Sequence, residues 1–216
     1  MKAVPITEEL YQYILDKSNT KDNLLEQLVR ETETLSIPLI QISPDQGRFL
    51  YLLCKMINAK DALEIGTLTG FSGIHIARGL AEGGMLTTVE LESKHGEIAA
   101  GYFEKAGLKD KVKIVISPAL DHMKNLIAGK RKFDFIFIDA NKTDYPLYFE
   151  AAINLSRKGT VIALDNMLKA GKVIEEAGDD ADLQAVQKTN EIISKDARVE
   201  SMLVTIGDGL AVAVVK

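Results

Sequence analysis

The sequence predicts an α/β fold with a seven-stranded, mostly parallel sheet, helices on both faces and an antiparallel C-terminal hairpin. Short apolar runs alternate with helical patterns between residues 62 and 194, and this alternation is typical of βαβ units. Two more strand-like runs, at 201–206 and 210–215, are separated only by Gly207-Asp208-Gly209. A link this short forces the two strands to pair as a hairpin. The first sixty residues carry helical patterns, which indicates an N-terminal helical extension.

The bulk composition indicates a single soluble domain. The 216 residues are 46% hydrophobic, which is enough for one large core. A net charge of −5 and a pI near 5.3 weigh against a large nucleic-acid surface. The single cysteine, Cys54, excludes an intramolecular disulfide and favours a reducing compartment. No apolar stretch approaches the ~20 residues of a membrane span, and no signal-peptide pattern begins the chain. We therefore expect a cytoplasmic protein.

Three helices are predicted before the sheet. Apolar residues recur at helical spacing over Ile6–Lys17 and again over Asp22–Leu35, as in amphipathic helices. A third helix begins at Ser43 and continues to Ile57. We expect Ser43 to cap it, Pro44 to occupy its first turn, and Gln46 to complete a capping box.

The remaining elements follow in βα order. The predicted strands are 62–65, 86–90, 112–116, 133–138 and 160–164, and the helices between and after them are 71–81, 94–106, a segment ending at Ala128, 145–155 and 181–194. Parallel strands joined by helices on both faces make a Rossmann-like sheet, in which ligands bind outside the carboxyl ends of the strands.

A glycine turn follows the first strand. Residues 63–72 have the sequence LEIGTLTGFS, a strand–loop–helix pattern that brings a ligand close to the backbone. The loop matches neither G-x-G-x-x-G nor a phosphate-binding Walker loop. The second strand ends at Glu90, where a carboxylate can accept both hydroxyls of a ribose. Ser117-Pro118-Ala119 after the third strand would leave space for an adenine edge.

Two further strands end in carboxylates. Asp139 follows the strand 133–138, and Asp165 follows the strand 160–164 with Asn166 directly after it. If the two strands are adjacent, these side chains surround one small volume. Three hard oxygen donors fit a Mg²⁺-type site better than a Zn²⁺ site. Lys142 stands within reach of that volume. The plain alternative is that both aspartates only cap the following helices.

These segments together resemble one known family. LEIGTLTGFS, TTVELES, FDFIFIDANKTDY, IALDNM and IGDGLAVAVVK are similar to the cation-dependent, S-adenosylmethionine-dependent O-methyltransferases, which include caffeoyl-CoA and catechol O-methyltransferases and bacterial relatives. The resemblance extends from about Tyr11 to Lys216. It implies that Asp139, Asp165 and Asn166 bind a divalent cation, either Mg²⁺ or another such as Mn²⁺ or Ca²⁺. It also implies that Lys142 is the catalytic base.

The resemblance implies a cofactor site as well. The residues it assigns to S-adenosylmethionine are Glu64, which orients the glycine loop, Gly66, Thr67 and Ser72 in and after that loop, Glu90 at the ribose, Ala119 at the adenine, and Asp139, which contacts both metal and cofactor. Within one domain, helices in 1–58 would precede a cofactor- and metal-binding core in 59–216. The resemblance further implies a homodimer and a catechol-type acceptor, a vicinal dihydroxy aromatic of the caffeoyl or phenylpropanoid kind.

Several features bear on the acceptor. Asn141 stands where the family usually has aspartate, and the chain has no tryptophan. Residues 167–182 are expected to form a substrate lid, with a plain surface loop as the alternative. The N-terminal helices would either cover the acceptor, so that Arg48 and the residues near Ile42 border the substrate, or meet a second subunit. Tyr145 and Tyr148 are expected to pack their helix on the sheet, with a supporting role at the site as the alternative.

Other functions remain open at this point. A hydroxylated uridine in tRNA is an alternative acceptor. A nicotinamide-dependent dehydrogenase is a second alternative, although the missing G-x-G-x-x-G disfavours it. A relative that binds the cofactor without catalysis is a third.

Overall fold

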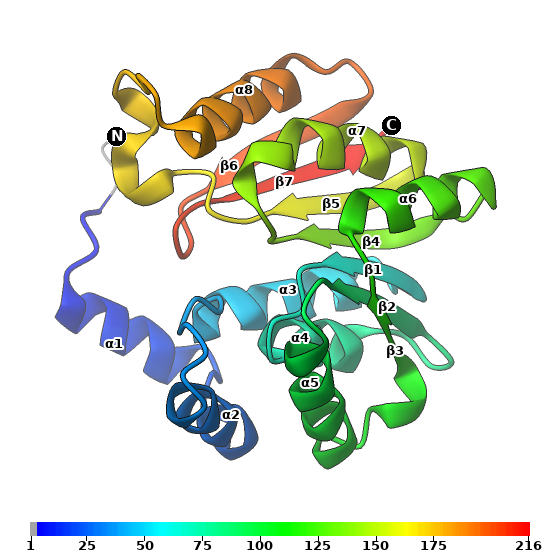
Figure 1. Cartoon of the computed structure of the whole chain (residues 1–216). Coiled ribbons are helices and arrows are strands. Elements are labelled where there is room, and N and C mark those ends of the chain that lie inside the picture. The colour runs from blue at the N-terminus through cyan, green and yellow to red at the C-terminus, as the bar shows by residue number, and fades with distance from the viewer. Residues whose placement is uncertain (1–3) are drawn as a thin grey trace.

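The computed structural model describes residues 4–216 and confirms the predicted fold class. Seven strands form one sheet in the order β3-β2-β1-β4-β5-β7-β6 (Figure 1). Their bounds are β1 Asp61–Ile65, β2 Met85–Glu90, β3 Val112–Ile116, β4 Phe133–Ile138, β5 Ser156–Leu164, β6 Val199–Val204 and β7 Leu210–Val215. β1 to β5 are parallel, and β7 runs antiparallel to both β5 and β6.

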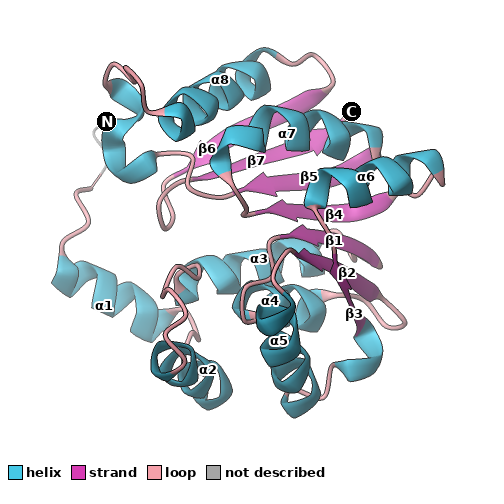
Figure 2. Ribbon diagram, viewed as in Figure 1, coloured by secondary structure: helices cyan, strands magenta, loops and turns pink. Residues whose placement is uncertain are grey.

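Helices cover both faces of this sheet, as Figure 2 shows. The α-helices are α1 Glu8–Lys17, α2 Asn23–Thr34, α3 Pro44–Met56, α4 Phe71–Gly79, α5 Ser93–Lys105, α6 Ala119–Ala128, α7 Tyr145–Asn154 and α8 Ala181–Lys195, with 3₁₀ turns η1 Lys109–Lys111, η2 Lys142–Asp144 and η3 Lys169–Ile174. Among residues 4–216, no helix is long and apolar enough to cross a membrane.

Strand β4 shows how the sheet divides the core. Phe135 and Phe137 lie in a cluster with residues of α3, α4 and α5. Ile136 and Ile138 lie in a second cluster with residues of α6, α7 and α8. Successive side chains of a strand point to opposite faces, so an unbroken apolar strand is buried between two helical layers. The end of β4, which leads into Asp139, is thereby held firmly in the middle of the sheet, on the side where the parallel strands have their carboxyl ends.

The C-terminal hairpin differs in detail from the prediction. Its first strand spans 199–204 rather than 201–206, and β7 lies inside the sheet, leaving β6 as the edge. The turn between them returns to the carboxyl end of β5: the backbone N–H of Met167 donates to Gly209 O (2.9 Å), and that of Leu168 to Asp208 O (2.9 Å). The hairpin turn therefore supports the segment that follows Asp165.

The capping box predicted at Ser43 is wrong. Pro44 occupies the first turn of α3 as expected, but the Ser43 side chain makes no capping hydrogen bond. The side chain of Gln46 turns away from the helix end and donates to Asp165 at the end of β5. In a capping box the Gln46 side chain would accept from the backbone N–H of Ser43. The bond to Asp165 is favoured instead, because a hydrogen bond to an ionised carboxylate is stronger than one between two neutral groups.

Candidate active site

A cavity of about 1150 Å³ lies at the carboxyl ends of β1, β2, β4 and β5. Its lining includes most of the predicted site residues, namely Gly66, Thr67, Ser72, Glu90, Ala119, Asp139, Lys142 and Asn166. Glu64 and Asp165 are not among the lining residues; they are 0% and 3% exposed and lie behind the wall. Parallel strands end on the same side of a sheet, so residues up to a hundred positions apart meet here.

The glycine loop touches the end of β4. Gly66 has a φ of +94°, and a Cβ at this position would overlap the carbonyl oxygen of Asp139. Only glycine satisfies both conditions. The two strand ends are also joined by a hydrogen bond from Asp139 N to Ile65 O (2.8 Å). A ligand in the cavity is therefore met by the loop and by Asp139 together.

Glu90 organises the loop as well as facing the cavity. Its Oε2 accepts from the backbone N–H groups of Thr67 (3.1 Å) and Leu68 (2.8 Å). Its Oε1 accepts from Leu91 N and Glu92 N, both at 3.0 Å. Four backbone donors fix this carboxylate at the end of β2, where the cofactor ribose was predicted to bind.

Glu64 lies beneath the loop. Its Oε1 accepts from the Ser72 hydroxyl and its Oε2 from the Thr88 hydroxyl, each at 2.6 Å. Burial raises the pKa of Glu64 to about 7, because a carboxylate without solvent favours its neutral form. Its contact with Ser72 fits the predicted role of orienting the loop.

Lys142 is held between a carboxylate and a phenol. Its Nζ lies 2.7 Å from Asp139 Oδ1 and donates to the Tyr145 hydroxyl at 2.8 Å. Tyr145 is fully buried, and burial, followed by the charge of Asp139, raises its pKa well above the usual value. Tyr145 packs α7 on the sheet as predicted, and it also supports Lys142. The spacing of three residues, about one helical turn, is the signal that this contact required.

Asp165 and Asn166, at the end of β5, lie in different environments. Asp165 is buried, and its Oδ1 accepts from Gln46 Nε2 at 2.5 Å. Burial and then the charge of Asp139 raise the pKa of Asp165. Asn166 has a φ of +57°, a left-handed conformation that asparagine tolerates, and it lines the cavity. The chain thus turns sharply between the two side chains.

The donor set fits a hard divalent cation. No group of three His, Cys, Asp or Glu residues suited to a metal occurs within residues 4–216. Two carboxylates and one amide oxygen are too few and too hard for a closed zinc site. Mg²⁺ is usually held by one or two carboxylates and keeps several waters or substrate oxygens. Asp139, Asp165 and Asn166 match that pattern.

Of the residues predicted to border the substrate, some line the cavity and one does not. Ile42 lines the cavity together with Ile40 and Gln41. Arg48 does not line it; its guanidinium stacks on the Tyr51 ring, 4.4 Å from the centroid. Residues 167–182 contribute Lys169 and Asp182 to the rim. Their side chains form an ion pair of 3.1 Å, which ties the start of this segment to its end.

The fold is that of a Rossmann-like methyltransferase, as similarity to solved structures shows. An O-methyltransferase from Bacillus cereus in complex with SAH is 41% identical and covers 95% of this chain and 96% of its own, with a TM-score of 0.89. The O-methyltransferase TomG from Streptomyces achromogenes, involved in tomaymycin synthesis and solved with SAM, is 32% identical over 98% of this chain and 100% of its own, with a TM-score of 0.90.

Sequence comparison identifies the family. The O-methyltransferase family model matches residues 15–216. A catechol O-methyltransferase of Niastella koreensis is 37% identical over 217 residues, covering 98% of each chain. The chain belongs to the O-methyltransferase family. This membership excludes the nicotinamide-dependent dehydrogenase considered from the sequence.

Proposed function

We propose that this O-methyltransferase uses S-adenosylmethionine and a divalent cation to methylate one hydroxyl of a vicinal dihydroxy aromatic compound. The observation that carries the proposal is the meeting of two half-sites on one cavity. Gly66 and Glu90 line one part of it, and Asp139, Lys142 and Asn166 line another. The catechol O-methyltransferase among the relatives supports the same acceptor class.

The cofactor half-site rests on the loop between β1 and α4. Gly66 permits close approach of the ligand, Ser72 presents a hydroxyl anchored by Glu64, and Glu90 presents carboxylate oxygens for a ribose. Ala119 at the start of α6 leaves room beside the third strand. S-adenosylmethionine supplies a methyl group on a sulfonium, so the cofactor itself is the electrophile. The solved relatives with SAH and SAM support this choice.

The acceptor half-site is expected to hold the cation. Asp139, Asp165 and Asn166 would bind it, and it would lower the pKa of a coordinated hydroxyl as a Lewis acid. This chain's contribution is to place the two carboxylates and the amide at the ends of neighbouring strands. The resulting fixed orientation is worth up to roughly 7–11 kcal/mol in favourable reactions.

Lys142 is the proposed base. Its Nζ is fixed by Asp139 and by Tyr145 at the cavity wall, so it does not sample the rotamers of a free lysine. In the neutral form, Nζ would accept the hydroxyl proton, and the hydroxyl oxygen would take the methyl group that S-adenosylmethionine supplies. The products are the methyl ether, the demethylated cofactor and a protonated Lys142.

A direct test follows methyl transfer from labelled S-adenosylmethionine to caffeic acid with Mg²⁺ and then with excess EDTA. We expect transfer that EDTA abolishes and that added Mg²⁺ restores. The Asp139→Asn variant serves as the matched control and should be inactive even with Mg²⁺. Transfer that persists in EDTA would contradict the cation requirement. Methylation of bulk tRNA in place of caffeic acid would instead support the hydroxyuridine alternative.

A further inference from the structure

We infer that Gln46 is a positioning residue for Asp165 and that the β6–β7 turn clamps Gln46 in this role. The inference rests on the proposed cation site and adds to it a residue from the N-terminal helical region. Gln46 lies in the first turn of α3 and Asp165 at the end of β5, 119 residues apart. Neither side chain belongs to the lining of the cavity.

The contact between Gln46 and Asp165 is buried, and Gln46 must be its hydrogen-bond donor. Gln46 is 1% exposed and Asp165 is 3% exposed, so water cannot replace either partner. Gln46 Nε2 donates to Asp165 Oδ1 at 2.5 Å. An ionised carboxylate only accepts, so the amide must present its N–H group. Bonding at Oδ1 restricts the rotation of the Asp165 carboxylate.

The neutral amide suits this position better than a charged group. A carboxylate at residue 46 would add a third negative charge beside Asp139 and Asp165 and repel the second. A lysine would neutralise Asp165 and oppose an incoming cation. Glutamine orients the carboxylate and leaves its charge available. Groups that hydrogen-bond to a metal ligand in this way typically contribute 10–100-fold to metal affinity.

A glycine on the far side holds the amide in place. Gly207, in the turn between β6 and β7, has a φ of +54°, and a Cβ there would overlap Gln46 Oε1. The backbone of this turn therefore lies directly against the Gln46 amide. The neighbouring Ser43 hydroxyl is buried and, among residues 4–216, has no hydrogen-bond partner, so it does not bond to Gln46. The turn and Asp165 together fix the side chain.

The main test measures Mn²⁺ binding by the loss of the free-ion electron paramagnetic resonance signal. We compare the full-length protein with Gln46→Met, which keeps the length of the side chain and removes its donor. We expect Mn²⁺ to bind about 10-fold or more weakly to the variant, with SAH affinity unchanged. The control is Thr189→Val, which removes a buried hydroxyl that donates to Ala185 O on α8. That variant should keep the Mn²⁺ affinity of the wild type.

A second variant displaces the Gln46 side chain without substituting Gln46 itself. Gly207→Ala should weaken Mn²⁺ binding because its methyl group displaces the Gln46 amide. Gly83→Ala is the matched control, since Gly83 also has a positive φ of +72° but nothing lies within 4 Å of the added Cβ. In the double variant Gln46→Met/Gly207→Ala, the two losses should not add, because both remove the same hydrogen bond.

The outcomes separate the two proposals. Equal Mn²⁺ affinity in wild type and Gln46→Met overturns the positioning role of Gln46 and leaves the cation site standing. No Mn²⁺ binding by the wild type overturns the cation site, and this inference with it. Losses that add fully in the double variant overturn the clamp by the β6–β7 turn.

Discussion

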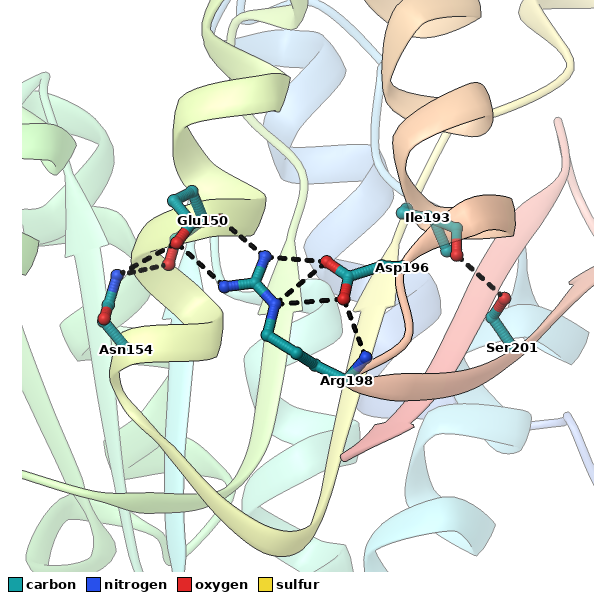
Figure 3. Close-up of polar contacts among 6 residues, drawn as sticks. All are labelled: Glu150, Asn154, Ile193, Asp196, Arg198 and Ser201. Carbon is teal, nitrogen blue, oxygen red and sulfur yellow. Dashed lines mark hydrogen bonds and ion pairs between the residues drawn. The ribbon is translucent and has the colours of Figure 1, made fainter. Parts of the chain in front are cut away.

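Two regions of the molecule each place a pair of carboxylates beside one basic side chain, with opposite results. At the corner of α7, α8 and β6, Arg198 lies between Glu150 and Asp196 (Figure 3). It donates to both oxygens of Glu150, at 3.0 and 2.7 Å, and to both oxygens of Asp196. At the carboxyl ends of β4 and β5, Lys142 forms an ion pair with Asp139, and Asp165 accepts from the neutral amide of Gln46.

The difference separates a structural cluster from a binding site. Hydrogen bonds from Arg198 lower the pKa of Glu150 and of Asp196, so the ionised form of each carboxylate stabilises the folded protein. Burial and the charge of Asp139 raise the pKa of Asp165, so its ionised form opposes folding. Shifts of this second kind gather at functional sites. Asp165 accepts from a neutral amide rather than from a cationic side chain, so its charge is the one that a cation would neutralise.

The largest expected effect comes from removing the lysine. Lys142→Met should lower kcat/KM for methyl transfer by about 10²–10⁴-fold, the usual contribution of a positioned acid–base group. Steady-state kinetics with labelled S-adenosylmethionine measures it, and calorimetry should show SAH bound as in the wild type. The matched variant at the other cluster, Arg198→Met, should keep full activity. Equal losses of kcat/KM in Lys142→Met and Arg198→Met would contradict the distinction between a binding site and a structural cluster.

The next effect is a gain in stability from removing a charge at the site. In metal-free protein with EDTA, Asp165→Asn should be more stable than the wild type at pH 8. The unfolded pKa of Asp165 is near its usual value of 3.8, and the folded pKa is raised to about 6. The stability present below pH 3.8 is therefore lost as the pH rises through 6, by up to roughly 3 kcal/mol.

Urea unfolding followed by circular dichroism measures this difference between pH 4 and pH 8. The advantage of Asp165→Asn should shrink toward zero at the acid end. Saturating Mn²⁺ should stabilise the wild type at pH 8 and leave the variant unchanged, because binding to the native state alone adds stability. An advantage of the same size at every pH would mean that the charge of Asp165 is not its cause.

The sequence predicted the fold because local patterns decide it. The unbroken apolar run of β4 requires two covering layers, and the three-residue link at 207–209 requires a hairpin. The positions of Asp139, Asp165 and Asn166 follow from the rule that parallel strands end together. The order of β7 and β6 in the sheet was not predictable, since a hairpin can join an edge by either strand.

The parts that the sequence did not predict are contacts between distant elements. Gln46 matched a capping box by spacing, yet its partner lies 119 residues away, and spacing carries no information about such a pair. Arg48 was placed near the substrate by proximity in sequence alone, whereas a helix directs successive side chains to different faces. Tyr145 was predicted to pack, and its hydroxyl contact with Lys142 depends on the tight turn of η2.

The smallest expected effect tests the paired cluster itself. Arg198→Met should destabilise the protein by about 1 kcal/mol at pH 7, since the pairs are partly exposed and screened by solvent. The pKa values of Glu150 and Asp196 are lowered in the folded state. Their contribution is therefore present above the ordinary carboxylate pKa values and is lost as the pH falls through the lowered ones. Urea unfolding of the variant and the wild type should show a larger difference at pH 7 than at pH 3, and 1 M salt should reduce the difference at pH 7. Relative to the wild type, Asp165→Asn therefore gains stability as the pH rises, whereas Arg198→Met loses it. The opposite slopes follow from the partners of the carboxylates, because Glu150 and Asp196 each accept from an arginine and Asp165 accepts from a neutral amide.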